Sequence, residues 1–196
     1  SAIGIAGEYP GSLKYYGVEY KQVDLTPDGK PDHEKIRAAA SDKRVKAVTV
    51  QRSRGYSGRD AFTVAEIGKI CDIVHEVNPA AAVIVDNCYG EFTEKTEPTQ
   101  AGADLIAGSL IKNPGGGLAP TGGYIAGRRD LVEAAAMRLT TPGIGGECGP
   151  TLGNNRLLFQ GFFLAPHTVA QALKTAVFCA GIMEKLGYRS SPSPSA

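Results

Sequence analysis

Short apolar segments that are typical of buried strands alternate with helical spacing through the first half of the chain. Strands are predicted at 45–50, 82–85 and 105–108, and a helix at 64–77 lies between the first two. Parallel strands need crossover connections, so this alternation favours a mainly parallel sheet covered by helices, with right-handed crossovers. The sequence therefore predicts an α/β fold of three layers, α/β/α, with helices on both faces of the sheet.

Local signals set the boundaries of the predicted elements. Thr63 is a suitable N-cap for the helix at 64–77, Glu66 completes a capping box, and Asn78-Pro79 ends the helix. Further strands are predicted at 17–24 and 122–126, and further helices at 32–40, 130–139 and 166–186, the last closed by a glycine.

The composition is that of an ordinary globular protein. The chain has 196 residues, of which 42% are hydrophobic and 21% charged, with a net charge of +1 and no basic block. Neither a nucleic acid nor an anionic membrane is therefore an expected partner. No apolar run approaches the ~20 residues that span a bilayer, and the first residues do not resemble a signal peptide, so we expect a cytoplasmic protein.

The cysteines and histidines lack the spacing of a metal site. The four cysteines form no CxxC pair, and the three histidines lie far apart. We therefore expect no metal, and we expect reduced, mostly buried thiols.

Polar side chains follow three of the predicted strands. Arg52, Asp86 and Ser109 each lie at or just past the carboxyl end of a strand. In open α/β sheets, ligands bind beyond these ends. The three residues together therefore predict a ligand site at one edge of the sheet.

Asp86 and Lys112 are the residue types that pyridoxal phosphate (PLP) requires. This cofactor needs a lysine for its Schiff base and a carboxylate that keeps its pyridinium nitrogen protonated. Lys112 follows a buried strand and precedes a glycine-rich turn, and we expect burial and nearby positive charge to lower its pKa. The alternatives are a surface lysine in a loop and an aspartate that caps a turn.

Three neighbours extend this candidate site. Ser109 could donate its hydroxyl to the cofactor phosphate, or it could be structural. Tyr89 could reach the phenolic oxygen of the cofactor, or it could be a packed aromatic. Asn87 is a weaker candidate for orienting groups around the cofactor ring.

The loops contain two further motifs. In the loop at 51–57, Arg52 or Arg54 could bind a phosphate or a carboxylate, although surface arginines are frequent. The glycine run at 115–117 lacks the GxxxxGK[ST] pattern, so a nucleotide site is not favoured.

Several motifs resemble those of one family. Asp86-Asn-Cys-Tyr-Gly-Glu-Phe92, Gly108-Ser-Leu-Ile-Lys-Asn-Pro-Gly-Gly-Gly117 and Thr121-Gly-Gly-Tyr-Ile-Ala-Gly127 resemble the aluminium-resistance protein family. That family is a methionine gamma-lyase-like, or cystathionine beta-lyase-like, branch of the fold-type I PLP enzymes. The segments 51–57 and 141–147 are also similar to this family, and the resemblance covers about 4–188.

The resemblance implies a role for each candidate residue. Lys112 would be the Schiff-base lysine, Asp86 the pyridinium partner and Ser109 the phosphate-binding serine, whereas Ile111 stands where relatives often carry a threonine. Residues 1–188 would be the central part of a fold-type I PLP-binding large domain, and 189–196 a linker toward a small C-terminal domain. The phosphate loop, the ring-stacking aromatic and the arginine for the substrate carboxylate would lie outside this chain.

The resemblance also implies an activity. We expect a PLP-dependent carbon–sulfur lyase that catalyses beta or gamma elimination on cystathionine-like or methionine-like amino acids. An aminotransferase, an aldolase-type lyase and a non-catalytic fragment of such an enzyme are the alternatives, because one fold supports many reactions. Fold-type I sites are built between two subunits, so a homodimer or homotetramer is expected.

Overall fold

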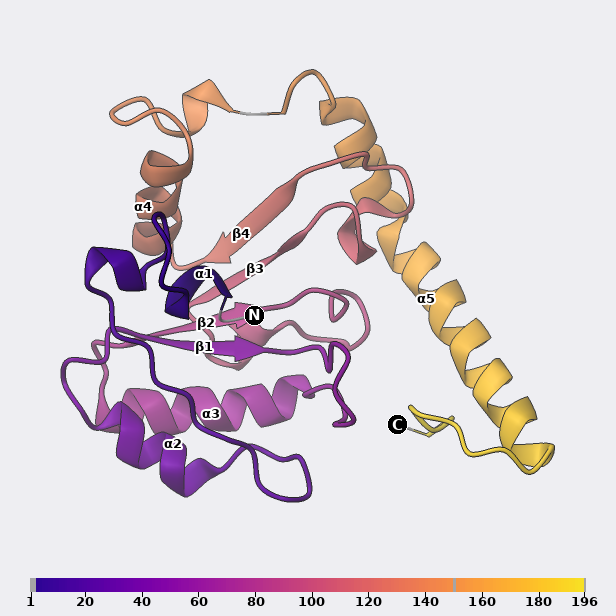
Figure 1. The fold of residues 1–196 in the computed structure, drawn as a ribbon. Coiled ribbons are helices and arrows are strands. Elements are labelled where there is room, and N and C mark those ends of the chain that lie inside the picture. Colours follow the sequence, from indigo (N-terminus) through magenta and orange to yellow (C-terminus); the bar gives the residue numbers. More distant parts are fainter. Residues whose placement is uncertain (1–2, 150, 196) are drawn as a thin grey trace.

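The computed structural model describes residues 3–149 and 151–195, and Figure 1 shows a mixed α/β fold around one sheet. The four strands have the order β1-β2-β3-β4. The first three are parallel to one another, and the fourth is antiparallel to its neighbour: β1 (Ala47–Gln51), β2 (Ala82–Asp86), β3 (Leu105–Ser109) and β4 (Gly123–Gly127). The predicted mainly parallel sheet is confirmed.

Two helices cover one face of this sheet. Helices α2 (His33–Ala40) and α3 (Val64–Val77) pack together and lie below the sheet in Figure 1. The capping box predicted for α3 is present, since the Thr63 side chain accepts from the Glu66 amide and Glu66 accepts from Thr63 in return. The main hydrophobic core forms where α3 meets the strands, and its fully buried members include Ile67, Cys71, Val74, Val83 and Val85.

The opposite face is covered by the N-terminal part of the chain. Helix α1 (Ile3–Ala6) and the segment after the 3-10 helix η1 (Lys14–Tyr16) lie there, because Ile5 and Tyr20 line one cavity together with Ile84 of β2. Side chains alternate along a strand, so Ile84 points away from α3 while Val83 and Val85 point toward it. Helices therefore flank both faces, as predicted.

The prediction of a strand at 17–24 is wrong. This segment is described in full and pairs with no strand. It crosses the face of the sheet, so that Tyr20 and Gln22 lie over Thr49 and Ile84 instead of beside the edge strand β1. Seven of the eight residues at 17–24 are exposed and Val23 is half-buried, so the alternating polarity here marks an extended segment without a ladder partner.

The other helices follow the strands. The short 3-10 helices are η2 (Pro98–Ala101), η3 (Asn113–Gly115) and η4 (Gly146–Cys148), and the longer helices are α4 (Arg129–Leu139) and α5 (Asn155–Lys185). Helix α5 was predicted to begin at Pro166, but it runs through this proline from Asn155. A proline inside a helix costs about 3 kcal/mol, and the packing of α5 on η3 offsets that cost.

Helix α5 and the turn after Lys112 meet through their backbones. A Cβ added to Gly161 of α5 would overlap the carbonyl oxygen of Gly115, and one added to Gly116 would overlap the carbonyl oxygen of Gly161. Gly116 also has a φ of 56°, which favours glycine. The glycine-rich turn is therefore needed for a close helix contact.

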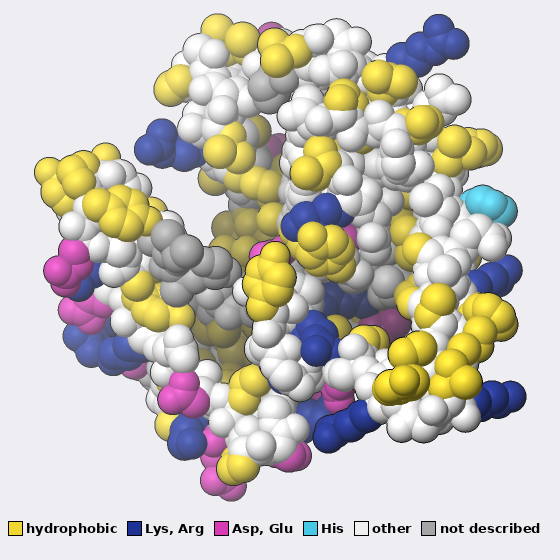
Figure 2. Space-filling view, turned by 45° about the vertical axis from the view of Figure 1, so that its right-hand side comes forward, with side chains coloured by type: hydrophobic (Ala, Val, Ile, Leu, Met, Phe, Trp, Pro, Cys, Tyr) yellow, Lys and Arg dark blue, Asp and Glu magenta, His cyan; other side chains and the backbone are white. Residues whose placement is uncertain are grey.

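Beyond this contact, most of α5 is exposed. Its buried residues are Gly161, Ala165 and Val169, while large apolar side chains such as Phe163 and Phe178 face outward. Figure 1 shows α5 extending away from the sheet, and Figure 2 shows hydrophobic side chains spread over one face of the molecule. Within the described residues, no helix combines the length and hydropathy needed to cross a membrane.

The four cysteines are free, as predicted, but they are not mostly buried. Cys71 is buried in the core, Cys88 is half-buried, and Cys148 and Cys179 are exposed.

Asp104 fixes the beginning of β3. One of its carboxylate oxygens accepts from the Val83 amide at 2.7 Å and lies 2.9 Å from His75 Nε2, and the other accepts from Arg128 Nη1 at 3.0 Å. These partners belong to β2, α3 and the junction of β4 with α4. One buried carboxylate thus aligns the central strand with its surroundings.

A buried polar network joins the carboxyl ends of the parallel strands to β4. We call it the edge network, and its members are Arg52, Asn87, Glu91, Glu97 and Tyr124. Arg52 Nη1 donates to Asn87 Oδ1 at 2.8 Å, and Asn87 Nδ2 donates to Glu97 Oε2 at 2.9 Å and to Tyr124 Oη at 3.3 Å. Tyr124 Oη donates to Glu91 Oε1 at 2.7 Å. The network therefore holds β1, β2 and β4 in register at this edge.

Glu91 is the least satisfied member of the edge network. Its side chain is 4% exposed, and its Oε2 atom is buried without a hydrogen-bond partner among the described residues. Burial raises the pKa of Glu91, the hydrogen bond from Tyr124 lowers it, and the net pKa lies above its usual value. Burial of Tyr124 and its hydrogen bond to Glu91 raise the pKa of Tyr124.

Replacing Gly161 with alanine should destabilise the fold. Alanine favours a helix over glycine by about 1 kcal/mol, but the added methyl group would overlap Gly115, and such overpacking costs about 1–3 kcal/mol. Gly181→Ala is the matched control, because a Cβ there meets no atom within 4 Å. Urea denaturation of both variants measures the difference, and a Gly161→Ala protein as stable as Gly181→Ala would contradict the close contact.

The variant Glu91→Gln should remove one pH dependence of stability. The Glu91 pKa is raised from 4.5 in the folded state, so its stabilising contribution is complete below pH 4.5 and is lost as the pH rises through the folded pKa. Glutamine keeps an oxygen for Tyr124 but does not titrate in this range. The melting temperature of Glu91→Gln relative to the unsubstituted protein should therefore rise from pH 4.5 upward.

The same substitution at Glu133, an exposed residue of α4, controls for the change in net charge. A Glu91→Gln difference that stays flat across this pH range would show that the Glu91 carboxyl is not perturbed.

Candidate functional site

Asp86 and Ser109 lie on the same face of the sheet at its carboxyl edge. The strand register places Asp86 opposite Ala107, and Ser109 follows two residues later on the same side. Asp86 is exposed, and its Oδ1 atom accepts from the Cys88 amide at 3.1 Å. This is the turn-capping contact that we considered as an alternative, and the second carboxylate oxygen leaves room for a ligand as well.

A cavity of about 510 Å³ opens beside Asp86. Its floor is the sheet face that carries Ile84, Asp86 and Ala107, and its wall includes Ile5 and Tyr20 from the N-terminal part. This size lies within the usual range of small-molecule and cofactor sites. The cavity therefore adjoins the carboxylate that the sequence singled out.

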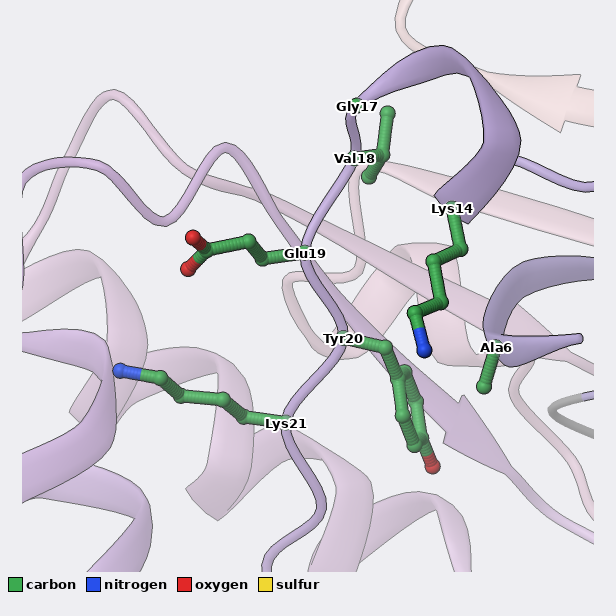
Figure 3. Close-up of a pocket in the computed structure, with 7 residues that line it drawn as sticks. All are labelled: Ala6, Lys14, Gly17, Val18, Glu19, Tyr20 and Lys21. Atoms are coloured by element: carbon green, nitrogen blue, oxygen red, sulfur yellow. The ribbon is translucent and has the colours of Figure 1, made fainter. Parts of the chain in front are cut away.

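A second hollow of about 470 Å³ lies along the N-terminal segment. Figure 3 shows the side chains of Lys14 and Tyr20 close to Ala6, whereas Glu19 points away from them. Tyr20 lines both hollows. The second hollow contains none of the predicted site residues, so we place the candidate site at Asp86.

Lys112 is held in a tight turn directly after β3. Its amide donates to the Ser109 carbonyl at 3.2 Å, and its own carbonyl accepts from the Gly115 amide at 3.0 Å. The side chain is half-buried, and Nζ lies 4.4 Å from the centre of the Tyr89 ring. Lys112 does not line the 510 Å³ cavity itself, but lies at the neighbouring strand end.

The pKa of Lys112 is raised and not lowered as predicted. Burial lowers the pKa of Lys112. The hydrogen bond to Cys88 and the negative charge that Cys88, Tyr89 and Asp86 can carry raise it by more, so the net pKa lies above its usual value. The prediction was wrong because the groups that raise this pKa, Cys88, Tyr89 and Asp86, outweigh the effect of burial. Asp86, at the end of the neighbouring strand β2, is among the groups that raise this pKa.

Tyr89 lies at the surface in an uncommon backbone conformation. Its side chain is 61% exposed, so the packed-aromatic alternative is wrong. Its φ is 68°, and Phe92 in the same loop has a φ of 62°, a region that non-glycine residues seldom adopt. The structure brings the Tyr89 ring to Lys112, and a contact of Tyr89 with a cofactor stays a prediction.

Asn87 and Arg52 point into the edge network and not into the cavity. Asn87 is fully buried, and its amide is engaged by Arg52, Glu97 and Tyr124. A role for Asn87 in orienting cofactor groups therefore stays a prediction without a contact to support it. Arg52 is 3% exposed and bound to Glu94 and Glu97, so it is not available for the anion that we predicted.

Arg54 remains at the surface, where its Nη1 atom donates to Ser191 at 2.9 Å.

Glu91, Tyr124 and Asn113 were missed by the sequence analysis. Asn113 Nδ2 donates to the Glu91 carbonyl at 3.0 Å and so ties the loop after β2 to the turn of Lys112. The sequence signal that could have indicated these buried groups was the pair Gly90 and Gly108. A Cβ on Gly90 would overlap the Arg52 guanidinium, and a Cβ on Gly108 would overlap the Glu91 carboxylate. No group of three or more His, Cys, Asp or Glu within 3–149 and 151–195 could hold a metal ion.

Sequence relatives cover nearly all of this chain. It is 53% identical over 186 residues to YnbB of Bacillus subtilis strain 168, an uncharacterised protein, with 95% of this chain and 44% of YnbB aligned. It is 48% identical over 190 residues to an uncharacterised 33.9 kDa protein in the glnA 5' region of Lactobacillus delbrueckii subsp. bulgaricus, with 97% and 62% aligned. The chain thus spans less than two thirds of either relative.

Solved structures show the same fold. A carbon-sulfur lyase involved in aluminum resistance from Clostridium novyi NT has a TM-score of 0.92 and 48% identity, with 99% of this chain and 47% of that chain covered. metB from Corynebacterium glutamicum has a TM-score of 0.65 at 20% identity, with 90% and 42% covered, and at this identity the likeness concerns the fold alone. The fold class predicted from the sequence, part of a fold-type I large domain, is confirmed.

The family model of methionine gamma-lyase matches residues 1–196, the whole of this chain. Together with the sequence relatives and the carbon-sulfur lyase structure, this match establishes that the chain belongs to the methionine gamma-lyase family.

Proposed function

We propose that this chain carries the cofactor-binding part of a PLP-dependent carbon–sulfur lyase that acts on sulfur amino acids by beta or gamma elimination. The observation that carries the proposal is the placement of a carboxylate and a primary amine, Asp86 and Lys112, at adjacent strand ends. Membership of the methionine gamma-lyase family supports it.

The residues at this edge fit the chemical needs of PLP. The cofactor requires a covalent lysine and an acidic partner for its ring nitrogen, and the carboxylate of Asp86 acts on the pKa of the Lys112 amine. The cavity beside Asp86 has the volume of a cofactor site. When bound, PLP supplies an electron sink for negative charge at the substrate α carbon.

Each residue would then have one task. Lys112 would hold the cofactor covalently and, once released, would take the proton from the substrate α carbon and return one. Asp86 would keep the ring nitrogen protonated, because a nearby negative charge stabilises the cation. Ser109 would donate its hydroxyl to the phosphate, Tyr89 would contact the phenolic oxygen, and Asn87 would orient groups around the cofactor ring.

The raised pKa of Lys112 has a consequence for cofactor loading. An amine attacks an aldehyde only after losing its proton, and the acidic neighbours of Lys112 hold that proton. Loading of PLP should therefore become faster as the pH rises.

Partners and location are proposed on the same basis. We infer a small amino-acid substrate, a homodimer or homotetramer and a cytoplasmic location. The exposed apolar side chains of α5 support association with further protein surface, because exposed apolar patches mark such contacts.

Borohydride reduction of the protein mixed with PLP should fix the cofactor on Lys112. Peptide mapping by mass spectrometry identifies the modified residue, and Lys112→Ala should lose the label. Lys14→Ala is the matched control, because Lys14 lines the second hollow and should not affect labelling. A label on Lys14, or a label that survives in Lys112→Ala, would show that the site is misplaced.

Product analysis should separate elimination from the other reactions of this fold. Incubation of the longest available form of the protein with L-cystathionine or L-methionine should release ammonia with pyruvate or 2-oxobutyrate, and Lys112→Ala should release neither. Transfer of the amino group to a 2-oxo acid would favour an aminotransferase. Normal PLP loading without either product would favour a non-catalytic protein.

A further inference from the structure

The loop that follows β2 is strained near Lys112. Tyr89 and Phe92 both have positive φ, at 68° and 62°, and neither is glycine. Such conformations persist only when surrounding contacts determine them, and they cluster at functional sites. The contacts that hold this loop are therefore of interest.

Arg52 contacts this loop on both sides of Tyr89. Its guanidinium donates to Asn87 Oδ1 at 2.8 Å, to Thr93 Oγ1 at 3.3 Å and to Glu94 Oε1 at 2.7 Å. Between these contacts it packs directly on Gly90, where no Cβ fits. The arginine lies outside the loop in sequence, at the end of β1, so it ties the loop to the sheet.

The loop in turn contacts the amine of Lys112. The Tyr89 ring lies 4.4 Å from Nζ, a distance at which an ammonium is attracted to an aromatic face. Asn113 joins the turn of Lys112 to the carbonyl of Glu91 in the same loop. A continuous set of contacts therefore runs from Arg52 through the loop to Lys112.

We propose that Arg52 is a positioning residue, whose buried guanidinium holds the loop at 87–94 in its strained form and so keeps the Tyr89 ring against the amine of Lys112. A catalytic effect of this contact rests on the proposed function of Lys112. The contacts themselves belong to this chain and do not depend on a cofactor.

A lysine could not replace Arg52 in this role. The planar guanidinium donates to Asn87, Thr93 and Glu94 at once, whereas an ammonium is a compact charge with three donors and no fixed fork. Arg52→Lys therefore keeps the charge beside Glu94 and Glu97 while it releases part of the loop.

The test measures the reactivity of Lys112 in protein prepared without PLP. A limiting amount of acetic anhydride is added over a range of pH, and mass spectrometry quantifies acetylation of Lys112 relative to Lys14 in the same sample. Tyr89→Leu should increase the relative labelling of Lys112 about 2- to 5-fold near neutral pH, the effect of losing one exposed cation–π contact.

Arg52→Lys should shift the labelling in the same direction. The double variant Arg52→Lys/Tyr89→Leu should label no more than Tyr89→Leu alone, because residues that act through one contact are not additive. Fully additive effects, or no effect of Arg52→Lys, would overturn the proposal.

Two controls separate positioning from loss of stability. Arg54→Lys changes a half-buried arginine two residues after Arg52, outside the loop at 87–94, and should leave the labelling unchanged. Ile67→Val lowers stability from the core, and an increase in labelling equal to that of Arg52→Lys would overturn the proposal. If Arg52→Lys does not fold, Glu94→Gln removes the negative charge 2.7 Å from the guanidinium and should give a smaller increase in the same direction, and an unchanged labelling would count against the proposal.

The outcome is distinct from that of the proposed function. Failure of PLP to load on Lys112, with the non-additive labelling intact, would contradict the proposed function alone. Normal loading with additive labelling would contradict the role of Arg52 alone.

Discussion

A positive charge buried at the carboxyl edge of the sheet governs the arrangement of everything around it. The Arg52 guanidinium is removed from water, so it requires close anionic and polar partners, and it finds Glu94, Glu97 and Asn87. Removing these partners would leave the desolvation cost of the buried guanidinium without compensation. The loop after β2 must therefore fold back over β1, and this fold-back brings Tyr89 to Lys112.

The same constraint explains two glycines. Gly90 leaves space for the guanidinium, and Gly108 leaves space for the Glu91 carboxylate. Gly90 lies in the loop after β2 and Gly108 lies near the end of β3, and both contact members of the edge network. The candidate site thus stands on a layer of buried polar groups, while the hydrophobic core lies deeper, between the sheet and α3.

The sequence predicts the fold well where local signals and tertiary packing agree. The helix at Val64–Val77 has its capping box and its apolar stripe, and both are found as predicted. The signals fail where packing overrides them. Pro166 does not begin α5, because the helix starts at Asn155, and Gly161 and Ala165 seat it on η3 ahead of the proline. The alternation at 17–24 belongs to a mostly exposed segment, and it does not imply a strand partner.

For the candidate site, the sequence predicts which residue types lie at the strand ends. It does not predict which side chains surround them. Asp86 and Lys112 stand near each other because the ends of adjacent parallel strands coincide. The partners of Arg52 lie 35 to 45 residues away in sequence, so no local pattern distinguishes its buried guanidinium from a surface arginine. The pKa of Lys112 depends on three side chains whose charges only the folded structure brings together.

The backbone of α5 contacts the turn after Lys112 directly, at Gly161 and Gly115. No rotatable side chain lies at this contact to absorb a displacement, and the turn it touches begins at Lys112. The helix continues from there to Lys185 with its far half exposed. A partner bound to that exposed half would therefore be connected to the turn of Lys112 by one continuous helix and one backbone contact.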